Sequence, residues 1–420
     1  MAVSFLARDV SDLCLGKPPL RSLSTAATVA EALAVLKNSD ESFISVWLCC
    51  EHEKEKEQCR CVGKVCMVDV ICYLCKEDNL LSPSSALNQP ISVILPKDCS
   101  LVVHLQPSSS LLEAIDLILQ GAQNLVVPIL PTKRSGVSRR KQHLKASSTI
   151  NSHNGCEFCW LTQEDVIRFL LGSIGVFTPL PALSLDSLGI ISSDVLAIDY
   201  FSPASSAVGA ISKSLTQQTS VAILDNDGTF IGEISPFTLA SCDETVVAAI
   251  ATLSAGDLMA YIDCGGPPED LVRVVKARLK EKSLEKMLQE FTILSSCDSL
   301  HSAFSSSSDE ESPTRTMTRS GRYSKSSSYS ARMVRKAEAI VCHPKSSLIA
   351  VMIQAIAHRV NYLWVIEDDC SLVGIVTFSN MLKVNEHGPS VVMSIAMWPG
   401  RYGQLDIMGI SVKYLIKVYG

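Results

Sequence analysis

Apolar residues recur along the chain with two periods, one typical of a helix and one typical of a strand. One face of the segment after Pro344 repeats apolar side chains at a spacing of about 3.6 residues, at Leu348, Val351, Met352, Ala355 and Ile356. The run 362–366 is too short for another helix and favours a strand, and 367–371 predicts a turn into a second strand at 372–377. The segment 344–383 therefore predicts a helix, two strands joined by a turn, and a new helix start.

This arrangement occurs four times, so the chain contains internal copies of one unit. In each copy a helix start precedes an apolar strand, and these strands are expected at 43–48, 125–130, 221–224 and 362–366. A second strand then ends in a related signature, which reads GKVCMVD at 63–69, CWLTQED at 159–165, GEISPFT at 232–238 and GIVTFSN at 374–380. The pattern predicts an α/β fold made of four such copies.

The signature resembles the end of a cystathionine-β-synthase-type domain, the CBS domain, where an apolar strand ends in Gly-Ile-Val-Thr-x-x-Asn/Asp. The four copies together cover most of residues 1–385, and the whole is similar to the plant proteins built only of CBS domains. The resemblance implies βαββα-type repeats that pair into two disc-like (Bateman-type) modules, with adenine nucleotides or S-adenosylmethionine held in clefts between paired copies. We expect copies 1 and 2 to pair, and likewise copies 3 and 4, with the helix face of Ala114, Ile115 and Ile118 buried between paired copies.

Composition shifts divide the chain into copies and connecting segments. The segment rich in serine has too few apolar residues to offset the entropy of ordering, so we expect it to be disordered. Its serines and basic residues are typical of a phosphorylated tract or of a plain spacer. The expected segments are copy 1 at 1–82, copy 2 at 83–175 with a basic loop insertion at 131–155, copy 3 at 176–264, a helical connector at 265–294, the Ser-rich loop at 295–333, copy 4 at 334–385 and an atypical tail at 386–420.

The basic loop insertion has several interpretations. It contains Lys133, Arg134, Arg139, Arg140, Lys141 and Lys145. A solvated loop explains them, and so do a kinase site near Ser147, a phosphate-contacting loop or a localisation signal. The sequence does not choose among these interpretations.

Charge and hydropathy exclude some classes of protein. The net charge of −6 over 420 residues gives no broad basic surface for nucleic acid. No apolar run reaches the roughly 18 residues that a membrane helix needs. The first residues carry Asp9 and Asp12 and fit neither a secretory signal nor a transit peptide. We therefore expect a cytoplasmic protein that binds neither nucleic acid nor membrane, with the nucleus left open as a location.

The 16 cysteines invite a metal or disulfide interpretation. Most replace small apolar residues within predicted elements, so we expect reduced core cysteines. One group brackets the charged insertion EHEKEKEQ and comprises Cys49, Cys50, His52, Cys59 and Cys61. Its spacing lacks the two-residue gap of paired zinc thiolates, so a solvated hairpin loop is favoured over a metal site.

The resemblance also implies which residues face a ligand. In the family, the Asp position of the signature accepts hydrogen bonds from ribose hydroxyls, and the Thr position approaches the phosphate. The corresponding residues here are Asp69, Thr162, Asp165, Ser235, Thr377 and Asn380. A hydroxyl followed three residues later by a carboxylate is also a helix capping box, so a purely structural role is the alternative.

The copies differ in the carboxylate that the ligand would need. Copies 1 and 2 keep Asp69 and Asp165, whereas copies 3 and 4 have Thr238 and Asn380 at this position. Because an ionised carboxylate accepts stronger hydrogen bonds than a neutral group, we expect an adenosyl ligand to prefer residues 1–175. Asp165 is the expected main ribose contact.

Motifs for catalysis are missing from the sequence. It has no Gly-x-x-x-x-Gly-Lys-Ser/Thr loop, no Gly-x-Ser-x-Gly and no His-Glu-x-x-His. We predict a non-enzymatic regulatory protein that senses AMP, ATP or S-adenosylmethionine and needs no cofactor. The alternative is a ligand-free scaffold that acts through protein contacts and phosphorylation of its Ser-rich loop; a thiol or zinc enzyme is disfavoured. The regulated protein is unidentified from the sequence, and a homodimer is left open.

Overall fold

The computed structural model describes residues 7–38, 42–49, 59–96, 101–129, 153, 155–173, 182–263, 268–292 and 338–383. The Ser-rich loop and the tail lie outside these ranges, as does the basic loop insertion except for its last residues. The predictions made for those three segments are therefore not addressed by the structure. Within the described ranges no helix is long and apolar enough to cross a membrane.

Four three-stranded sheets form the framework, one in each copy. In every sheet the middle strand pairs in parallel with the first strand and antiparallel with the third. The strands are β1 Ser22–Ser24, β2 Phe43–Leu48 and β3 Arg60–Cys66; β4 Val102–His104, β5 Asn124–Pro128 and β6 Phe158–Thr162; β7 Leu196–Asp199, β8 Val221–Leu224 and β9 Phe230–Ile234; and β10 Val341–Cys342, β11 Tyr362–Ile366 and β12 Leu372–Thr377. The short first strand, which the apolar pattern did not locate, completes the βαββα unit and confirms the predicted fold class.

Two helices accompany each sheet. A parallel strand pair needs a crossover connection, which is supplied by α2 Val29–Asn38, α6 Leu111–Leu119, α9 Val208–Gln217 and α16 Leu348–His358. The third strand runs directly into α3 Met67–Leu74, α7 Gln163–Leu171, α10 Pro236–Leu239 and α17 Phe378–Leu382. Ser347 caps the start of α16, where its hydroxyl accepts a hydrogen bond from the Ala350 amide at 3.4 Å.

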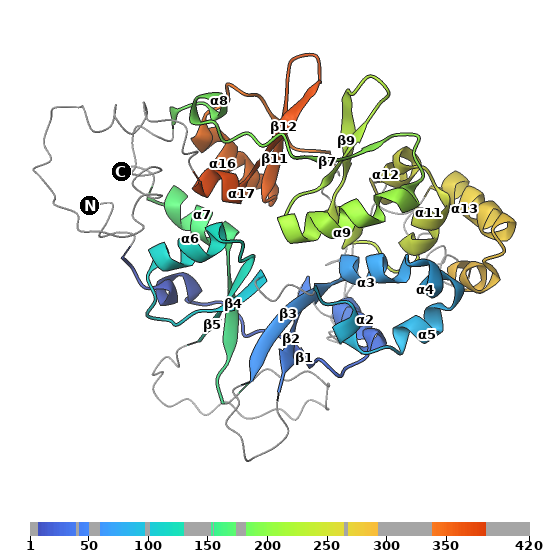
Figure 1. Cartoon of the computed structure of the whole chain (residues 1–420), viewed down its shortest axis with the longest axis horizontal. Helices are drawn as coiled ribbons and strands as arrows, with labels where there is room; N and C mark the ends of the chain where they lie inside the picture. The colour runs from blue at the N-terminus through green and yellow to red at the C-terminus, as the bar shows by residue number, and fades with distance from the viewer. Residues whose placement is uncertain are drawn as a thin grey trace, which may run out of the picture.

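The copies pair through their sheets, first with second and third with fourth. The sheets of copies 1 and 2 meet at a buried cluster that includes Trp47 and Val126, and those of copies 3 and 4 meet at Trp364 and Ala222. Figure 1 shows the sheets of copies 1 and 2 below the sheets of copies 3 and 4. The chain thus forms two modules of two copies each, as the fold class predicted.

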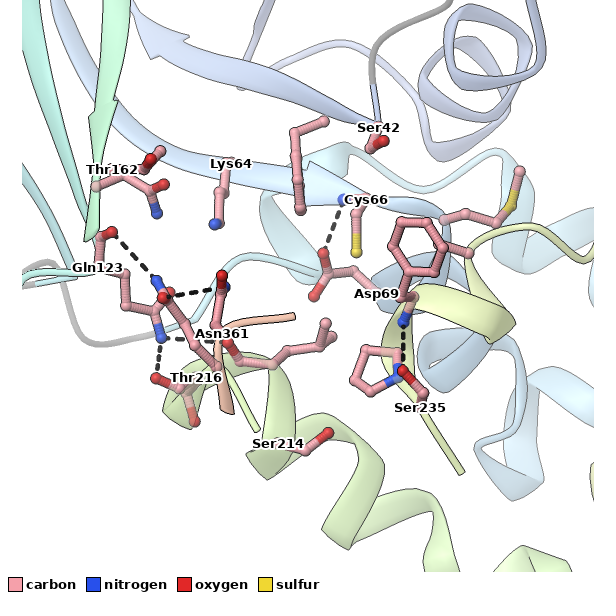
Figure 2. Close-up of a pocket in the computed structure, with 18 of the residues that line it drawn as sticks. Ser42, Lys64, Cys66, Asp69, Gln123, Thr162, Ser214, Thr216, Ser235 and Asn361 are labelled. Carbon is pink, nitrogen blue, oxygen red and sulfur yellow. Dashed lines mark hydrogen bonds between the residues drawn. The ribbon is translucent and has the colours of Figure 1, made fainter. Parts of the chain in front are cut away.

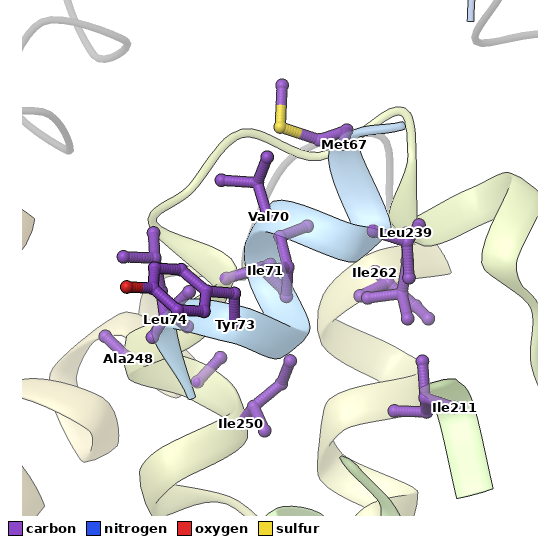
Figure 3. Close-up of a cluster of buried hydrophobic side chains, with 14 of the residues drawn as sticks. Met67, Val70, Ile71, Tyr73, Leu74, Ile211, Leu239, Ala248, Ile250 and Ile262 are labelled. Carbon is purple, nitrogen blue, oxygen red and sulfur yellow. The ribbon is translucent and has the colours of Figure 1, made fainter. Parts of the chain in front are cut away.

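Helices join the two modules face to face. One apolar cluster combines copy 1 with copy 3, where α3 packs against α9 and Leu74 of α3 lies beside Ala248 (Figure 3). A second cluster combines copy 2 with copy 4 through contacts of α6 and α7 with α17. Ala114, Ile115 and Ile118 are buried in this second cluster. Their predicted place between paired copies is therefore wrong, because the sheets make the contact within a module and leave the helices for the contact between modules.

Each module begins with a segment that packs on its second copy. The 3-10 helix η1 (Val10–Cys14) lies against copy 2, where the Val10 amide donates to the Ser109 carbonyl at 2.9 Å. The short α8 (Leu185–Leu188) lies against copy 4 in the same way, and the Leu185 amide donates to the Ser346 carbonyl at 3.0 Å. We call these two pieces the leading segments.

The remaining helices cover copies 1 and 3. After α3 come α4 Glu77–Leu81, α5 Pro83–Leu87 and the 3-10 helix η2 Ile91–Val93. Copy 3 contains the 3-10 helix η6 Ala204–Ala207, α11 Val246–Thr252 and α12 Ala255–Asp263, and α13 Glu269–Glu281 follows it. Helix α13 starts after Pro268 and buries Val275 and Leu279. The predicted connector at 265–294 is thus helical in its described part, with a further helical stretch over 285–292.

Candidate functional site

A cavity of about 1540 Å³ lies where the four copies meet. Every copy contributes polar side chains to its wall (Figure 2). They include Lys64, Cys66 and Asp69 from copy 1, Gln123, Thr162 and Arg168 from copy 2, Ser214, Thr216 and Ser235 from copy 3, and Arg359, Asn361 and Tyr362 from copy 4. The cavity is therefore a property of the assembled chain and of no single copy.

The junctions between third strands and their following helices bring four of these residues to the wall. β3 ends at Cys66 and α3 places Asp69 one turn later. β6 ends at Thr162, and Ser235 stands between β9 and α10. Because every copy repeats the same strand-to-helix junction, equivalent positions converge when the modules pack.

The ends of the crossover helices supply the opposite wall. Gln218 and Arg359 follow α9 and α16 and adopt left-handed backbone conformations, with φ of 54° and 55°. This conformation ends each helix sharply and turns the following residues toward the cavity. The same geometry thus delivers Gln218 from copy 3 and Asn361, two residues after Arg359, from copy 4.

Amide side chains connect three of the copies across the cavity. Gln123 Nε2 donates to the Leu215 carbonyl at 3.3 Å and also to the Thr216 carbonyl. Gln218 Nε2 returns a hydrogen bond to the Gln123 carbonyl at 3.1 Å, and Asn361 Nδ2 donates to Gln218 Oε1 at 3.4 Å. These bonds tie copy 2 to copies 3 and 4 around the cavity.

Copy 1 contributes a pair of opposite charges. Asp69 Oδ2 accepts the Cys66 amide at 2.8 Å, and Lys64 Nζ lies 4.5 Å from the centre of the Phe43 ring. Burial raises the pKa of Asp69, and the hydrogen bonds from Cys66 and the charge of Lys64 oppose the shift. Burial lowers the pKa of Lys64, opposed by the charges of Cys66 and Asp69. Burial thus disfavours the charged form of both side chains, and a ligand that offers a hydrogen-bond donor to Asp69 or an anion to Lys64 would stabilise that form.

Cys66 is not suited to nucleophilic catalysis. Burial and the neighbouring Asp69 raise the pKa of its thiol well above the ordinary value. The thiolate, which is the reactive form, is therefore disfavoured in this wall.

The six residues predicted to face a ligand divide into two groups. Asp69, Thr162 and Ser235 line the cavity, whereas Asp165, Thr377 and Asn380 do not. Asp165 Oδ2 accepts the amide and the hydroxyl of Thr162, both at 2.7 Å, and forms an ion pair with Lys17. Asp165 is thus engaged in a capping box and a salt bridge, which is the structural alternative that the sequence left open.

Copy 4 shows the same capping geometry with a neutral side chain. Asn380 Oδ1 accepts the amide of Thr377 at 3.0 Å and its hydroxyl at 2.7 Å. An amide oxygen therefore performs the cap as a carboxylate does. This equivalence makes aspartate-to-asparagine changes at the signature positions structurally mild.

Sequence reasoning missed several residues of the wall. Lys64 lies within the first signature, at a position where the other signatures have Trp160, Glu233 and Ile375. Gln123 and Asn361 directly precede middle strands, where no family motif marks them. Only the packing of one module on the other shows that these positions share a cavity.

Comparisons with known proteins agree with the repeated units. The sequence profile of the CBS domain matches residues 331–387, which contain copy 4. The chain is 54% identical over 395 residues to the CBS domain-containing protein CBSX5 of Arabidopsis thaliana, covering 91% of this chain and 98% of the relative. It is 29% identical over 436 residues to CBSX6 of the same plant, covering 93% and 96%.

A solved structure also matches over most of the chain. The crystal structure of protein MJ1225 from Methanocaldococcus jannaschii, proposed as an archaeal homolog of g-AMPK, covers 89% of this chain and 98% of its own with 12% identity and a TM-score of 0.48. The extended identity to the plant relative confirms the resemblance seen in the four signatures, and the chain belongs to the family of CBS domain-containing proteins.

Proposed function

We propose that this chain is a non-enzymatic regulatory protein that binds an adenosyl ligand, AMP, ATP or S-adenosylmethionine, in the central cavity. The observation that carries the proposal is the placement of Asp69 and Lys64 on one wall of a cavity lined by all four copies. Ligand pockets usually combine apolar walls with a few convergent polar groups, and this cavity has both.

Asp69 suits the ribose of such a ligand. Its carboxylate is a charge-assisted acceptor, and two ribose hydroxyls are donors that would restore its charged form. Thr162 and Ser235 add hydroxyl groups to the same cavity. The role that the sequence assigned mainly to Asp165 thus falls to Asp69 in this proposal.

The cations on the wall favour a nucleotide over S-adenosylmethionine. Lys64 and Arg359 line the cavity, and both side chains are donors that bind phosphate well. Arg168 also lines it but pairs with Glu164. S-adenosylmethionine carries a positive sulfonium where AMP and ATP carry phosphate. We therefore expect AMP or ATP to bind more tightly.

A ligand-free scaffold is the second candidate function. It is favoured by the way polar groups near the cavity satisfy one another, such as Gln123 with Gln218 and Asp165 with Lys17. In this case the chain would act through protein contacts and phosphorylation of the Ser-rich loop at 295–333, with no ligand at its centre.

Calorimetric titration of the full chain with AMP, ATP and S-adenosylmethionine tests the two candidates. Saturable binding is expected, and Asp69→Asn should weaken it about tenfold because the charged acceptor is lost while the cap is kept. Asp165→Asn is the matched control, since it makes the same change outside the cavity. Absence of binding for all three ligands would favour the scaffold, and a loss confined to Asp165→Asn would place the ligand elsewhere.

A further inference from the structure

Two cysteines face each other at the loop end of the copy 1 hairpin. Strands β2 and β3 are antiparallel, and their last pair is Leu48 with Arg60. The next residue on each side is Cys49 or Cys59, so the register brings two side chains together that are ten positions apart in sequence. Both thiols are reduced and half-buried.

A histidine from copy 2 completes the group. The ring of His153 stacks on the indole of Trp47 with centroids 3.8 Å apart and an angle of 7° between the planes. Its backbone exchanges hydrogen bonds with Cys156, from amide to carbonyl in both directions, at 2.9 and 3.0 Å. These contacts hold the imidazole in one place beside the hairpin end.

The three side chains match the requirements of a soft divalent cation. The two Sγ atoms and a ring nitrogen of His153 all lie within 4.8 Å of one another, and Cys49 Sγ is 3.4 Å from His153 Nδ1. In a tetrahedral zinc site the sulfur and nitrogen ligands are roughly 3.6 Å apart, as follows from bond lengths of about 2.3 and 2.0 Å. No carboxylate belongs to the group, so its chemistry favours Zn²⁺ over Mg²⁺ or Ca²⁺.

The buried state of His153 is a second, independent observation. Its side chain is only 4% exposed, and Nε2 has no hydrogen-bond partner in the described part of the chain. Burying an imidazole in this way costs free energy, and coordination through Nδ1 would not remove that cost, because Nε2 keeps no partner. The burial instead shows that the ring is fixed beside the two thiols and shielded from solvent.

We infer that Cys49, Cys59 and His153 form a zinc site that clamps the copy 1 hairpin to copy 2. Sequence spacing argued against zinc among Cys49, Cys50, His52, Cys59 and Cys61. His153 was not part of that group, because it is 94 positions beyond Cys59 and approaches the two cysteines only when the sheets of copies 1 and 2 pair. The site lies at the sheet interface of the first module and does not depend on the proposed ligand of the central cavity.

Metal titration of the reduced full-length protein tests the inference. Co²⁺ alone should give the visible bands of a tetrahedral ion and a thiolate-to-cobalt absorption, and Zn²⁺ should displace it with one zinc retained per chain after desalting. Cys59→Ser and His153→Gln should each weaken Co²⁺ binding more than tenfold. Cys156→Ser is the matched control, because this exposed cysteine lies three residues from His153 and outside the group.

Other outcomes would overturn the inference. Zinc-free wild-type protein after loading, or an unchanged cobalt spectrum in Cys59→Ser, would show that the group holds no metal. A Cys49–Cys59 disulfide in protein prepared without reductant or oxidant would assign the two thiols a different role. Because His153→Gln also removes the stack on Trp47, circular dichroism should confirm folding, and Cys59→Ser at the hairpin end provides a milder test.

Discussion

The indole N–H of Trp364 in copy 4 donates a hydrogen bond of 2.6 Å to the carboxylate of Glu233 in copy 3. The Tyr362 hydroxyl donates to the same oxygen at 2.9 Å. Glu233 is only 6% exposed, so this polar contact lies within the apolar interface between the two sheets. A buried carboxylate is tolerated only while its donors remain, and it therefore fixes how copies 3 and 4 pair.

Removing one donor should weaken the second module. Tyr362→Phe is expected to lower the free energy of unfolding by about 1–3 kcal/mol, because it leaves the buried Glu233 carboxylate with one donor fewer. Urea unfolding followed by fluorescence measures the change. The same substitution at Tyr73, a buried tyrosine whose hydroxyl has no hydrogen-bond partner within the described ranges, should cost less. Equal losses at both positions would contradict a special role for the Glu233 contact.

Asp263 should make stability depend on pH. Burial and the charge of Glu233 raise its pKa to about 6, and it is the last residue of α12, where a negative charge opposes the helix dipole. The folded state then holds the proton more tightly than the unfolded state, whose carboxyl titrates near 3.9. The contribution of this group to stability therefore falls as pH rises from about 4 to about 6.

Asp263→Asn tests that dependence. The variant should melt at a higher temperature than the wild type at pH 7, and the gap should close near pH 4. Asp257→Asn is the control within the same helix, because Asp257 lies in the first turn, where a negative charge is favourable. A stability gap for Asp263→Asn that is constant between pH 4 and pH 7 would refute the prediction.

The glycine that opens the signature is required to different degrees in different copies. A Cβ atom at Gly374 would lie 2.4 Å from the backbone oxygen of Ser192, which is held by reciprocal hydrogen bonds of 2.9 Å with Ile375. At Gly63 the nearest atom is Cδ2 of Leu95 at 2.7 Å, the end of a flexible side chain. Gly374→Ala should cost about 1–3 kcal/mol of stability through overpacking, and Gly63→Ala clearly less. Thermal unfolding of the two variants measures this difference. A larger loss of stability for Gly63→Ala than for Gly374→Ala would contradict the prediction.

Lys64 should discriminate ligands by their phosphate. If an adenosyl ligand occupies the cavity as proposed, Lys64→Met should reduce affinity for AMP about tenfold while leaving affinity for adenosine nearly unchanged, since only AMP offers the ammonium an anionic partner. Calorimetry with both compounds measures the difference. Arg273→Met, a change to an exposed cation outside the cavity, should alter neither affinity. A parallel loss for AMP and adenosine would mean that Lys64 does not contact phosphate.

The pattern of apolar residues predicted the copies well, because the middle strand of each sheet is an apolar run bounded by turn residues. The strands at 43–48, 221–224 and 362–366 coincide with β2, β8 and β11. The first strands were not located, since two to four residues such as Val341–Cys342 carry no period and depend on a neighbouring strand for their hydrogen bonds.

The site was predicted only in part. Signature positions identified Asp69, Thr162 and Ser235, which do line the cavity. The engagement of Asp165 by Lys17 could not be foreseen, because the two residues are 148 positions apart and meet only when the chain start packs on copy 2. The same holds for Lys64 and Asn361, which line one cavity only because the two modules pack on each other.

The leading segments restrict where this chain can be divided. Asp9 forms a bridge with Ser110 across copies, and Ser184 forms the equivalent bridge with Ser347. Dividing the chain between the two copies of a module would separate the second copy from the leading segment that packs on it. Dividing the chain just before Ser184 would keep both bridges intact. The smallest piece of the chain that keeps such a bridge whole is thus a pair of copies together with its own leading segment.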